Sequence, residues 1–339
     1  MVSKRTVITV TILSALLCQA CTNPLEYKPA DTADELVVNC LMDTGQTSHL
    51  AQLSVSTTQY VRPVQEATLR CYINGALIVE TSEIEDIPWY GGDNGRGISF
   101  DASLRAGDVV RLEVEAEGRF RAWNEQTVPE APLLGPVDTA RIKHKDEEYF
   151  RFDVRLDEAF PEEEEYFRLV IEDHTDAVYY DEDGNEIGRA SHSWMRPMHV
   201  DDDPILGDGH IASDSGDFNL EIGTPNEYGV FSDALFAGSQ ARLRPQVETQ
   251  IFGSVPPLLE GTTSISIDSY AVVRVMSLSQ RYYYYLKALN MLKSDTSDLA
   301  LEGVQIPDNV EGGIGFVGLS NSRTAVFGLG TRVFDMVYY

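Results

Sequence analysis

The densest group of potential metal ligands lies in a short stretch past the middle of the chain. Four carboxylates, Asp201, Asp202, Asp203 and Asp208, stand there between His199 and His210. Calcium takes six to eight oxygen ligands, whereas histidines suit a transition metal. Asp-Asp-Pro also begins turns readily, and nearby glycines favour a loop. The stretch therefore predicts either a metal site, with Ca²⁺ as the candidate ion, or a solvated acidic loop.

Aromatic side chains near loops form a second kind of candidate site. Trp89 and Tyr90 adjoin a glycine-rich stretch, and Trp194 precedes the acidic one. Each could serve as a platform for a ligand, or could pack against its own domain. The run Tyr282–Tyr285 offers a similar choice, because tyrosines stack on sugar rings and also fill amphipathic cores with a hydroxyl reaching a polar partner.

Three common motifs of enzyme active sites are missing from the sequence. It contains no Gly-x-Ser-x-Gly elbow, no His-Glu-x-x-His pair and no phosphate-binding P-loop. Its 54 acidic residues leave a glycosidase-type acid pair open, since the separation of two carboxyl groups cannot be read from a sequence. We therefore predict no catalytic residues and a protein that is not an enzyme, with a metal-assisted hydrolase as one alternative.

The first residues resemble a bacterial lipoprotein signal peptide. Lys4 and Arg5 precede an uncharged run, Thr6–Leu17, which is too short to span a bilayer, and Ala20 stands directly before Cys21. Residues 1–20 are therefore predicted to be removed and Cys21 to be lipidated. An ordinary secretory peptide and an apolar N-terminal helix are the alternatives. Acyl chains on Cys21 would hold the protein on a membrane.

Composition agrees with an exported globular protein. The chain has 339 residues, 43% of them apolar, and a formal net charge of -28, which disfavours binding to nucleic acid. Beyond Cys21 it contains Cys40 and Cys71, and the alternation of apolar residues places both thiols on the core side of predicted strands. In an oxidising envelope they would form a disulfide, and two buried free thiols are the alternative.

Apolar residues alternate with polar ones along most of the chain, as in Val110, Leu112 and Val114, and in Phe150, Phe152 and Val154. This period of two predicts a mainly β protein whose sheets have one face in a core. Prolines interrupt the pattern at 129–137 and predict a linker. We expect an immunoglobulin-like β-sandwich at 21–128 and a larger antiparallel β domain at 138–339, whose one helix near 280–293 is capped by Ser279.

Segments of the C-terminal half are similar to a known family. Val273–Lys287 resembles a strand-then-helix signature, and Pro307–Phe316 resembles an "N-x-x-G-G-x-G-x-F" element. Phe231–Gly238 and Asp202–Pro204 resemble further recurring pieces of the same family, domain of unknown function 4249, found in lipoproteins of Bacteroides-type bacteria. The resemblance runs from Cys21 nearly to the C-terminus and supplies no catalytic residues.

This resemblance implies an outer-membrane lipoprotein, often encoded beside a TonB-dependent transporter. The expected function is therefore that of a lipid-anchored accessory protein that works with such a transporter in nutrient capture or uptake. Which face of the outer membrane it occupies stays open. The alternatives are a structural or adhesive envelope protein and the metal-assisted hydrolase that would use the acidic stretch.

Overall fold

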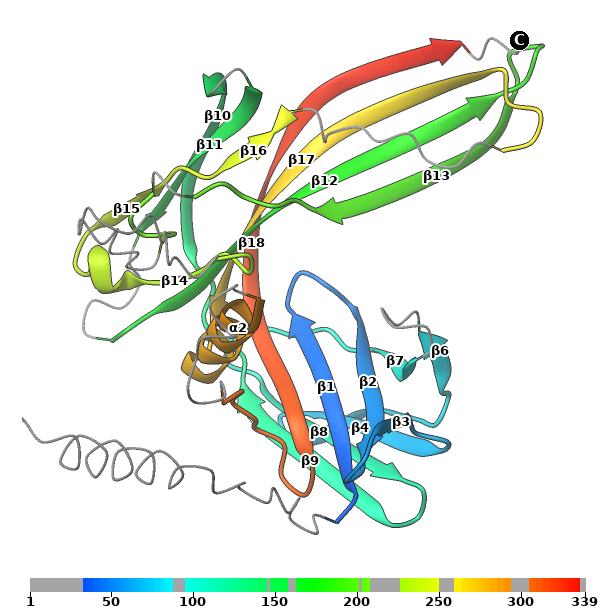
Figure 1. The fold of residues 1–339 in the computed structure, drawn as a ribbon, viewed down its shortest axis with the longest axis vertical. Coiled ribbons are helices and arrows are strands. Elements are labelled where there is room, and N and C mark those ends of the chain that lie inside the picture. Colours follow the sequence, from blue (N-terminus) through cyan, green and yellow to red (C-terminus); the bar gives the residue numbers. More distant parts are fainter. Residues whose placement is uncertain are drawn as a thin grey trace, which may run out of the picture.

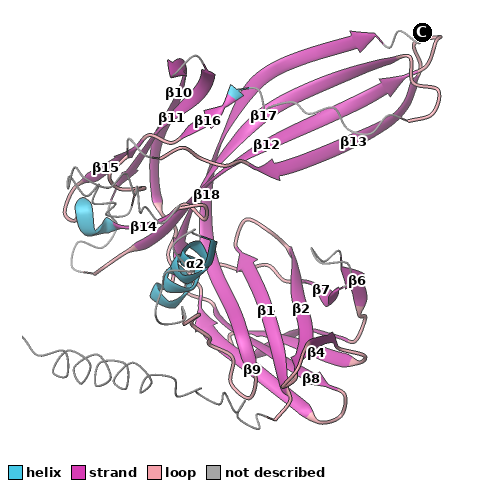
Figure 2. Cartoon of the chain, in the orientation of Figure 1, coloured by secondary structure: helices cyan, strands magenta, loops and turns pink. Residues whose placement is uncertain are grey.

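The computed structural model describes most of the chain from Ala33 onwards, in which strands dominate (Figure 2). The described residues are 33–87, 95–144, 147–157, 163–200, 203–207, 226–249, 259–293 and 305–335. The expected mainly β fold with one α-helix in the C-terminal half is confirmed for these residues. No described helix combines the length and the apolar character needed to cross a membrane.

Two sheets face each other in the N-terminal part and form a sandwich (Figure 1). One of them contains β1 (Glu35–Asp43), β2 (Ser48–Ser56), β3 (Val61–Pro63), β6 (Glu85–Ile87) and β7 (Gly95–Asp101). The other contains β4 (Ala67–Ile73), β5 (Ala76–Thr81), β8 (Val109–Ala116) and β9 (Phe120–Thr127). Alternate residues of both sheets, such as Val38, Leu53 and Leu112, meet in one buried core.

Long strands dominate the C-terminal part. They are β12 (Tyr166–Tyr180), β13 (Glu186–Met195), β17 (Ser264–Leu278) and β18 (Ile314–Asp335). A smaller sheet packs on one of their faces and comprises β10 (Leu133–His144), β11 (Glu147–Asp157), β15 (Gln240–Leu243) and β16 (Gln246–Glu248). Phe152, Leu169 and Val273 belong to the core between the two layers. The short β14 (Val230–Ser232) and the single-turn helix η1 (Asp233–Leu235) close one end.

The helix α2 (Gln280–Lys293) covers the opposite face of the long strands. It starts where predicted, because Ser279 Oγ accepts a hydrogen bond from the backbone N–H of Tyr282 at 3.3 Å. Tyr282 and Tyr283 are buried against Met276 and Phe316, so these two tyrosines of the run belong to the core. Tyr284 is exposed, and Tyr285 lies at the edge of the helix contact.

Strand β18 connects the two parts of the molecule. It pairs in parallel with β1 through Val37–Asp43 and antiparallel with β17 over its later residues, so one ten-stranded sheet runs through both. The division of the chain into two domains is therefore less sharp than the sequence pattern indicates. The expected linker at 129–137 also overlaps β10, which begins at Leu133.

Beyond this junction four strands continue as a curved projection, the upper part of Figure 1. We call it the blade and define it as residues 172–180, 186–195, 264–272 and 326–335, which pair in the order β13-β12-β17-β18. The start of β1 lies at the opposite end of the molecule (Figure 1). Because β18 has 22 residues, the distance along it is about 70 Å.

Candidate functional site

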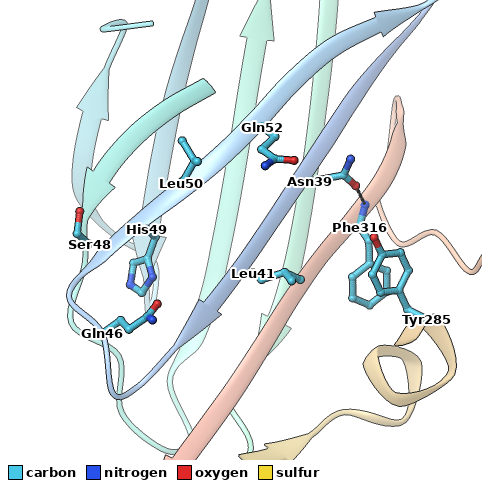
Figure 3. A pocket seen from close by; sticks show the side chains of 9 residues that line it. All are labelled: Asn39, Leu41, Gln46, Ser48, His49, Leu50, Gln52, Tyr285 and Phe316. Atoms are coloured by element: carbon cyan, nitrogen blue, oxygen red, sulfur yellow. Dashed lines mark hydrogen bonds between the residues drawn. The ribbon is translucent and has the colours of Figure 1, made fainter. Parts of the chain in front are cut away.

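A groove opens on the outer face of the N-terminal sandwich, beside α2 (Figure 3). Its volume is about 390 Å³, within the range of small-molecule sites. It is lined by Asn39, Leu41, Gln46, Ser48, His49, Leu50, Gln52, Tyr285 and Phe316. These nine residues are what we mean by the groove.

The floor of the groove is formed by two central strands of the sheet. Side chains of a strand alternate between its faces, so Asn39 and Leu41 of β1 lie on the same side as Ser48, Leu50 and Gln52 of β2. Strand β1 is paired with both β18 and β2, and β2 is also paired with β7. The backbone groups of Asn39 and Gln52 are therefore used within the sheet, and at these two positions the side chains remain to bind a ligand.

One wall of the groove is aromatic. The ring of Tyr285, on α2, stacks on Phe316, on β18, with centroids 4.1 Å apart and planes inclined by 9°. Asn39 Oδ1 accepts a hydrogen bond from the backbone N–H of Phe316 at 3.0 Å, which fixes the amide between floor and wall. Burial raises the pKa of Tyr285, and Tyr228 adds to this effect, so the phenol keeps its proton at neutral pH.

Several polar groups of the groove have no partner within the described part of the chain. The side chains of Gln46, Ser48 and Gln52 are exposed and make no hydrogen bond to another described residue, and neither does the hydroxyl of Tyr285. His49 differs from them, because it is buried and its Nε2 lies 2.9 Å from the carbonyl oxygen of Ala102. The three exposed side chains and the phenol offer both donors and acceptors to a ligand.

The lining of the groove contains no Asp, Glu, Lys or Arg. This distinguishes it from the rest of a chain in which 24% of the residues are charged and whose net charge is -28. A groove of this kind binds by shape, apolar contact and neutral hydrogen bonds. It offers no counter-charge to an ionic ligand.

A second polar constellation lies on the blade and has the residue types of a hydrolase triad. His174 Nε2 lies 3.0 Å from Glu172 Oε2 and 3.2 Å from Ser193 Oγ. Both contacts use the same ring nitrogen, whereas a triad needs the acid and the nucleophile on opposite nitrogens. The carboxylate of Glu172 also accepts hydrogen bonds from Arg274, from Nη2 at 3.1 Å and from Nε at 3.3 Å. This arrangement is that of a surface network on paired strands.

Of the four predicted metal ligands, the structure describes Asp203 alone. It is buried, and its Oδ1 accepts backbone hydrogen bonds from Ile205 at 3.0 Å and Leu206 at 3.1 Å, while Oδ2 accepts from the backbone of Arg244 at 2.5 Å. The carboxylate thus closes a turn and ties it to β15. Asp201, Asp202 and Asp208 lie outside the described residues, among which no group of three His, Cys, Asp or Glu is placed to hold a metal ion.

The remaining predicted residues fall into two groups. Cys21, Trp89 and Tyr90 lie outside the described residues, so their predicted roles stay predictions. Trp194 is 55% exposed on β13, the edge strand of the blade, and is far along the sheet from the groove.

Cys40 and Cys71 are both buried in the core of the sandwich, as the alternation predicts, and both are free. Burial raises the pKa of Cys40, and the neighbouring Cys71 raises it further. Burial likewise raises the pKa of Cys71 to about 11. In the structure the two cysteines are therefore free thiols, the alternative to a disulfide, and neither sulfur is ionised at neutral pH.

Sequence reasoning did not identify the groove. Its residues come from β1, β2 and the turn between them, and from α2 and the start of β18, which are distant from that hairpin in the sequence. The one signal that pointed to it was the tyrosine run, of which Tyr285 lines the groove while Tyr282 and Tyr283 fill the core.

The glycine-rich element that resembles the family has an architectural role. Asn309 forms two hydrogen bonds with the backbone of Val317, through Nδ2 at 2.8 Å and Oδ1 at 2.9 Å. Gly315 has φ +118°, and a Cβ there would collide with the carbonyl oxygen of Val38. The element therefore allows β18 to lie close against β1, and it sets the position of Phe316 in the wall.

Comparison with known proteins identifies a family. The sequence model of one family, described as "Domain of unknown function (DUF4249)", matches residues 22–325. No curated protein matches the chain. The matched range includes every residue of the groove and most of β18, so the chain belongs to the DUF4249 family.

Proposed function

We propose that the chain is a lipid-anchored accessory protein of the outer membrane that works with a TonB-dependent transporter in the capture or uptake of a nutrient. The observation that carries this proposal is the uncharged groove, which fits reversible binding of a small molecule. The anchor is proposed from the apolar leader and Cys21. The accessory role and the transporter partner are proposed from the anchor, the β-sandwich and the resemblance to a family of lipoproteins often encoded beside such transporters.

The shape of the molecule supports a role between a membrane and a second protein. Its described part begins at Ala33, close in sequence to Cys21, and β1 starts at the end opposite the blade (Figure 1). An anchor on Cys21 would therefore leave the blade free to contact another protein.

The surface of the blade suits such a contact. Its exposed large apolar side chains are Ile187, Trp194, Met195, Val326 and Val333. Strand β13 is also the terminal strand of the ten-stranded sheet, with partners on one side within the described residues. Exposed apolar side chains on an extended sheet mark surfaces that associate with other proteins.

Site-specific photocrosslinking in native membranes tests the partner. A photoreactive residue at Trp194 is expected to capture an outer-membrane transporter, whereas the same residue at Tyr60, exposed on the sandwich, is the matched control. Crosslinks at Trp194 to a second copy of the chain alone would support the structural alternative instead. A soluble protein without acyl chains in the same cells would remove the anchor from the proposal.

A further inference from the structure

We infer that the groove between α2 and strands β1 and β2 is a binding site for a neutral saccharide. This inference rests on the proposed function, because it names the class of nutrient that the accessory protein would capture. It is argued from three properties of the groove: its charge, its occupied backbone and the mixture of aliphatic, aromatic and amide groups in its lining.

The lack of charged side chains in the lining of the groove argues against ionic ligands. An anion in the groove would meet no Lys or Arg among the lining residues and would approach a chain of net charge -28. A cation would meet no carboxylate among the same residues. The ligand that fits without an uncompensated charge is neutral.

The occupied backbone argues against a peptide. Extended peptides bind sheets chiefly through main-chain hydrogen bonds to an open strand edge. In the floor of the groove, Asn39 lies between strands on both sides, paired with Phe316 of β18 and Gln52 of β2. Gln52 is in turn paired with Gly97 of β7. At these two positions recognition must come from side chains, which favours a ligand with many small polar groups.

The side chains match the two kinds of surface that a sugar presents. Leu41 is 44% exposed, and with Leu50 it offers aliphatic surface for the C–H face of a pyranose ring. The amides of Gln46 and Gln52 each offer a donor and an acceptor, as sugar hydroxyls require. The hydroxyl of Tyr285 adds a further polar group at the wall, and its ring is held flat against Phe316.

Ligand-observed NMR with the purified chain from residue 22 onwards tests the inference. The probes are neutral hexasaccharides of α-1,4-glucose, β-1,4-glucose, β-1,3-glucose, β-1,4-mannose and β-1,4-xylose. Hexagalacturonate serves as an anionic comparison, and an acetylated, amidated Gly-Ser hexapeptide as a peptide comparison. At least one neutral hexasaccharide is expected to bind with a Kd below about 10 mM. The inference is overturned if none of the neutral hexasaccharides binds with a Kd below about 10 mM. It is also overturned if the anion or the peptide binds more tightly than they do.

Variants locate the bound sugar. Gln52→Ala and Gln46→Ala each remove an exposed amide and are expected to weaken binding by about three- to tenfold, the effect of one lost hydrogen bond. Gln59→Ala, which removes an exposed amide outside the groove, is the matched control and should leave the Kd unchanged. If Gln52→Ala and Gln46→Ala bind the sugar as tightly as the control Gln59→Ala does, the sugar binds outside the groove and the inference is overturned.

The failure of this inference and that of the proposed function are separable. Gln52→Ala is expected to leave the crosslink from position 194 to the transporter intact, because the groove and β13 lie on different parts of the sheet. Loss of the crosslink with sugar binding retained would contradict the partner. A retained crosslink without sugar binding would contradict the ligand.

Discussion

Tyr285 of α2 lies flat on Phe316 of β18, with ring centroids 4.1 Å apart and an interplanar angle of 9°. This contact joins the helix to the strand at the point where β18 enters the N-terminal sandwich. Phe316 is fully buried, and Asn39 accepts a hydrogen bond from its backbone N–H. The stacked pair therefore serves both the packing of α2 and the wall of the groove.

Tyr285→Ala is expected to lower the free energy of unfolding by about 2 to 3 kcal/mol, since it removes a half-buried aromatic ring from its stack. Tyr285→Phe keeps the stack and should stay within about 0.5 kcal/mol of the wild type. Urea unfolding followed by circular dichroism measures both. The adjacent Tyr284, 48% exposed, is the control, and an equal loss in Tyr284→Ala would contradict a specific role for the stack.

Gly315→Ala is expected to prevent correct pairing of β18 with β1, because the added Cβ would collide with the carbonyl oxygen of Val38 at a positive φ of +118°. The soluble yield and the melting temperature should both fall. Gly328→Ala is the control on the same strand, where a Cβ meets no atom within 4 Å. Similar melting temperatures of the two variants would show that the close approach of the strands is dispensable.

Glu117 is expected to make stability depend on pH in the acidic range. Its carboxylate accepts hydrogen bonds from both Nη atoms of Arg62 at 2.6 Å, and these bonds hold the pKa of Glu117 below its usual value. A lowered folded-state pKa stabilises the protein above the pKa of the unfolded chain, about 4.3, and the gain is lost as the pH falls through the lower folded value.

Glu117→Gln should therefore lower the melting temperature at pH 7, and the difference from the wild type should shrink towards pH 3. Glu80→Gln, at an exposed glutamate 3.3 Å from Arg70, is the control and should show little change at either pH. A difference for Glu117→Gln that is constant from pH 7 to pH 3 would show that the ion pair contributes nothing.

Cys40 and Cys71 are expected to resist iodoacetamide in the folded protein, because burial raises the pKa of both thiols and keeps the reagent away. In denaturant without reductant, both should be alkylated, as counted by mass spectrometry of protein isolated from the cell envelope. Alkylation that appears only after reduction would instead reveal the disulfide that an oxidising compartment favours.

Asp203→Ala is expected to cost about 1 to 3 kcal/mol of stability, since three backbone N–H groups lose their acceptor. The loss should be the same in EDTA and in millimolar calcium. A loss seen with calcium alone would instead make Asp203 a metal ligand and would support the predicted site that includes Asp201, Asp202 and Asp208.

The sequence predicts the local structure of this chain well. The alternation that places Leu36, Val38 and Cys40 on one face of a strand agrees with their burial in β1. The cap at Ser279 and the helix to Lys293 follow from the residues at the helix start and the apolar spacing within it. Such features depend on neighbours a few residues apart, which a single sequence displays.

The sequence did not reveal which strands, distant along the chain, pair with each other. Val38 lies beside Gly315 and Cys40 beside Val317 in a parallel pair of strands, and alternation alone does not say which strands meet. The groove depends on that pairing, because it places Phe316 next to Asn39 and brings Tyr285 over both. The prolines at 129–137 indicated a boundary, whereas the shared strand makes the two parts continuous.

The shared strand has a consequence for the order in which the fold can form. Residues 37–43 pair with residues 314–320, and Val37 lies opposite Ile314, 277 residues later in the chain. Until those later residues are made, the first sandwich keeps an unpaired edge, open to adhesion by other nascent chains. The complete ten-stranded sheet is thus expected to form only after residues 314–320 have been synthesised, and the edge of β1 to need protection until then.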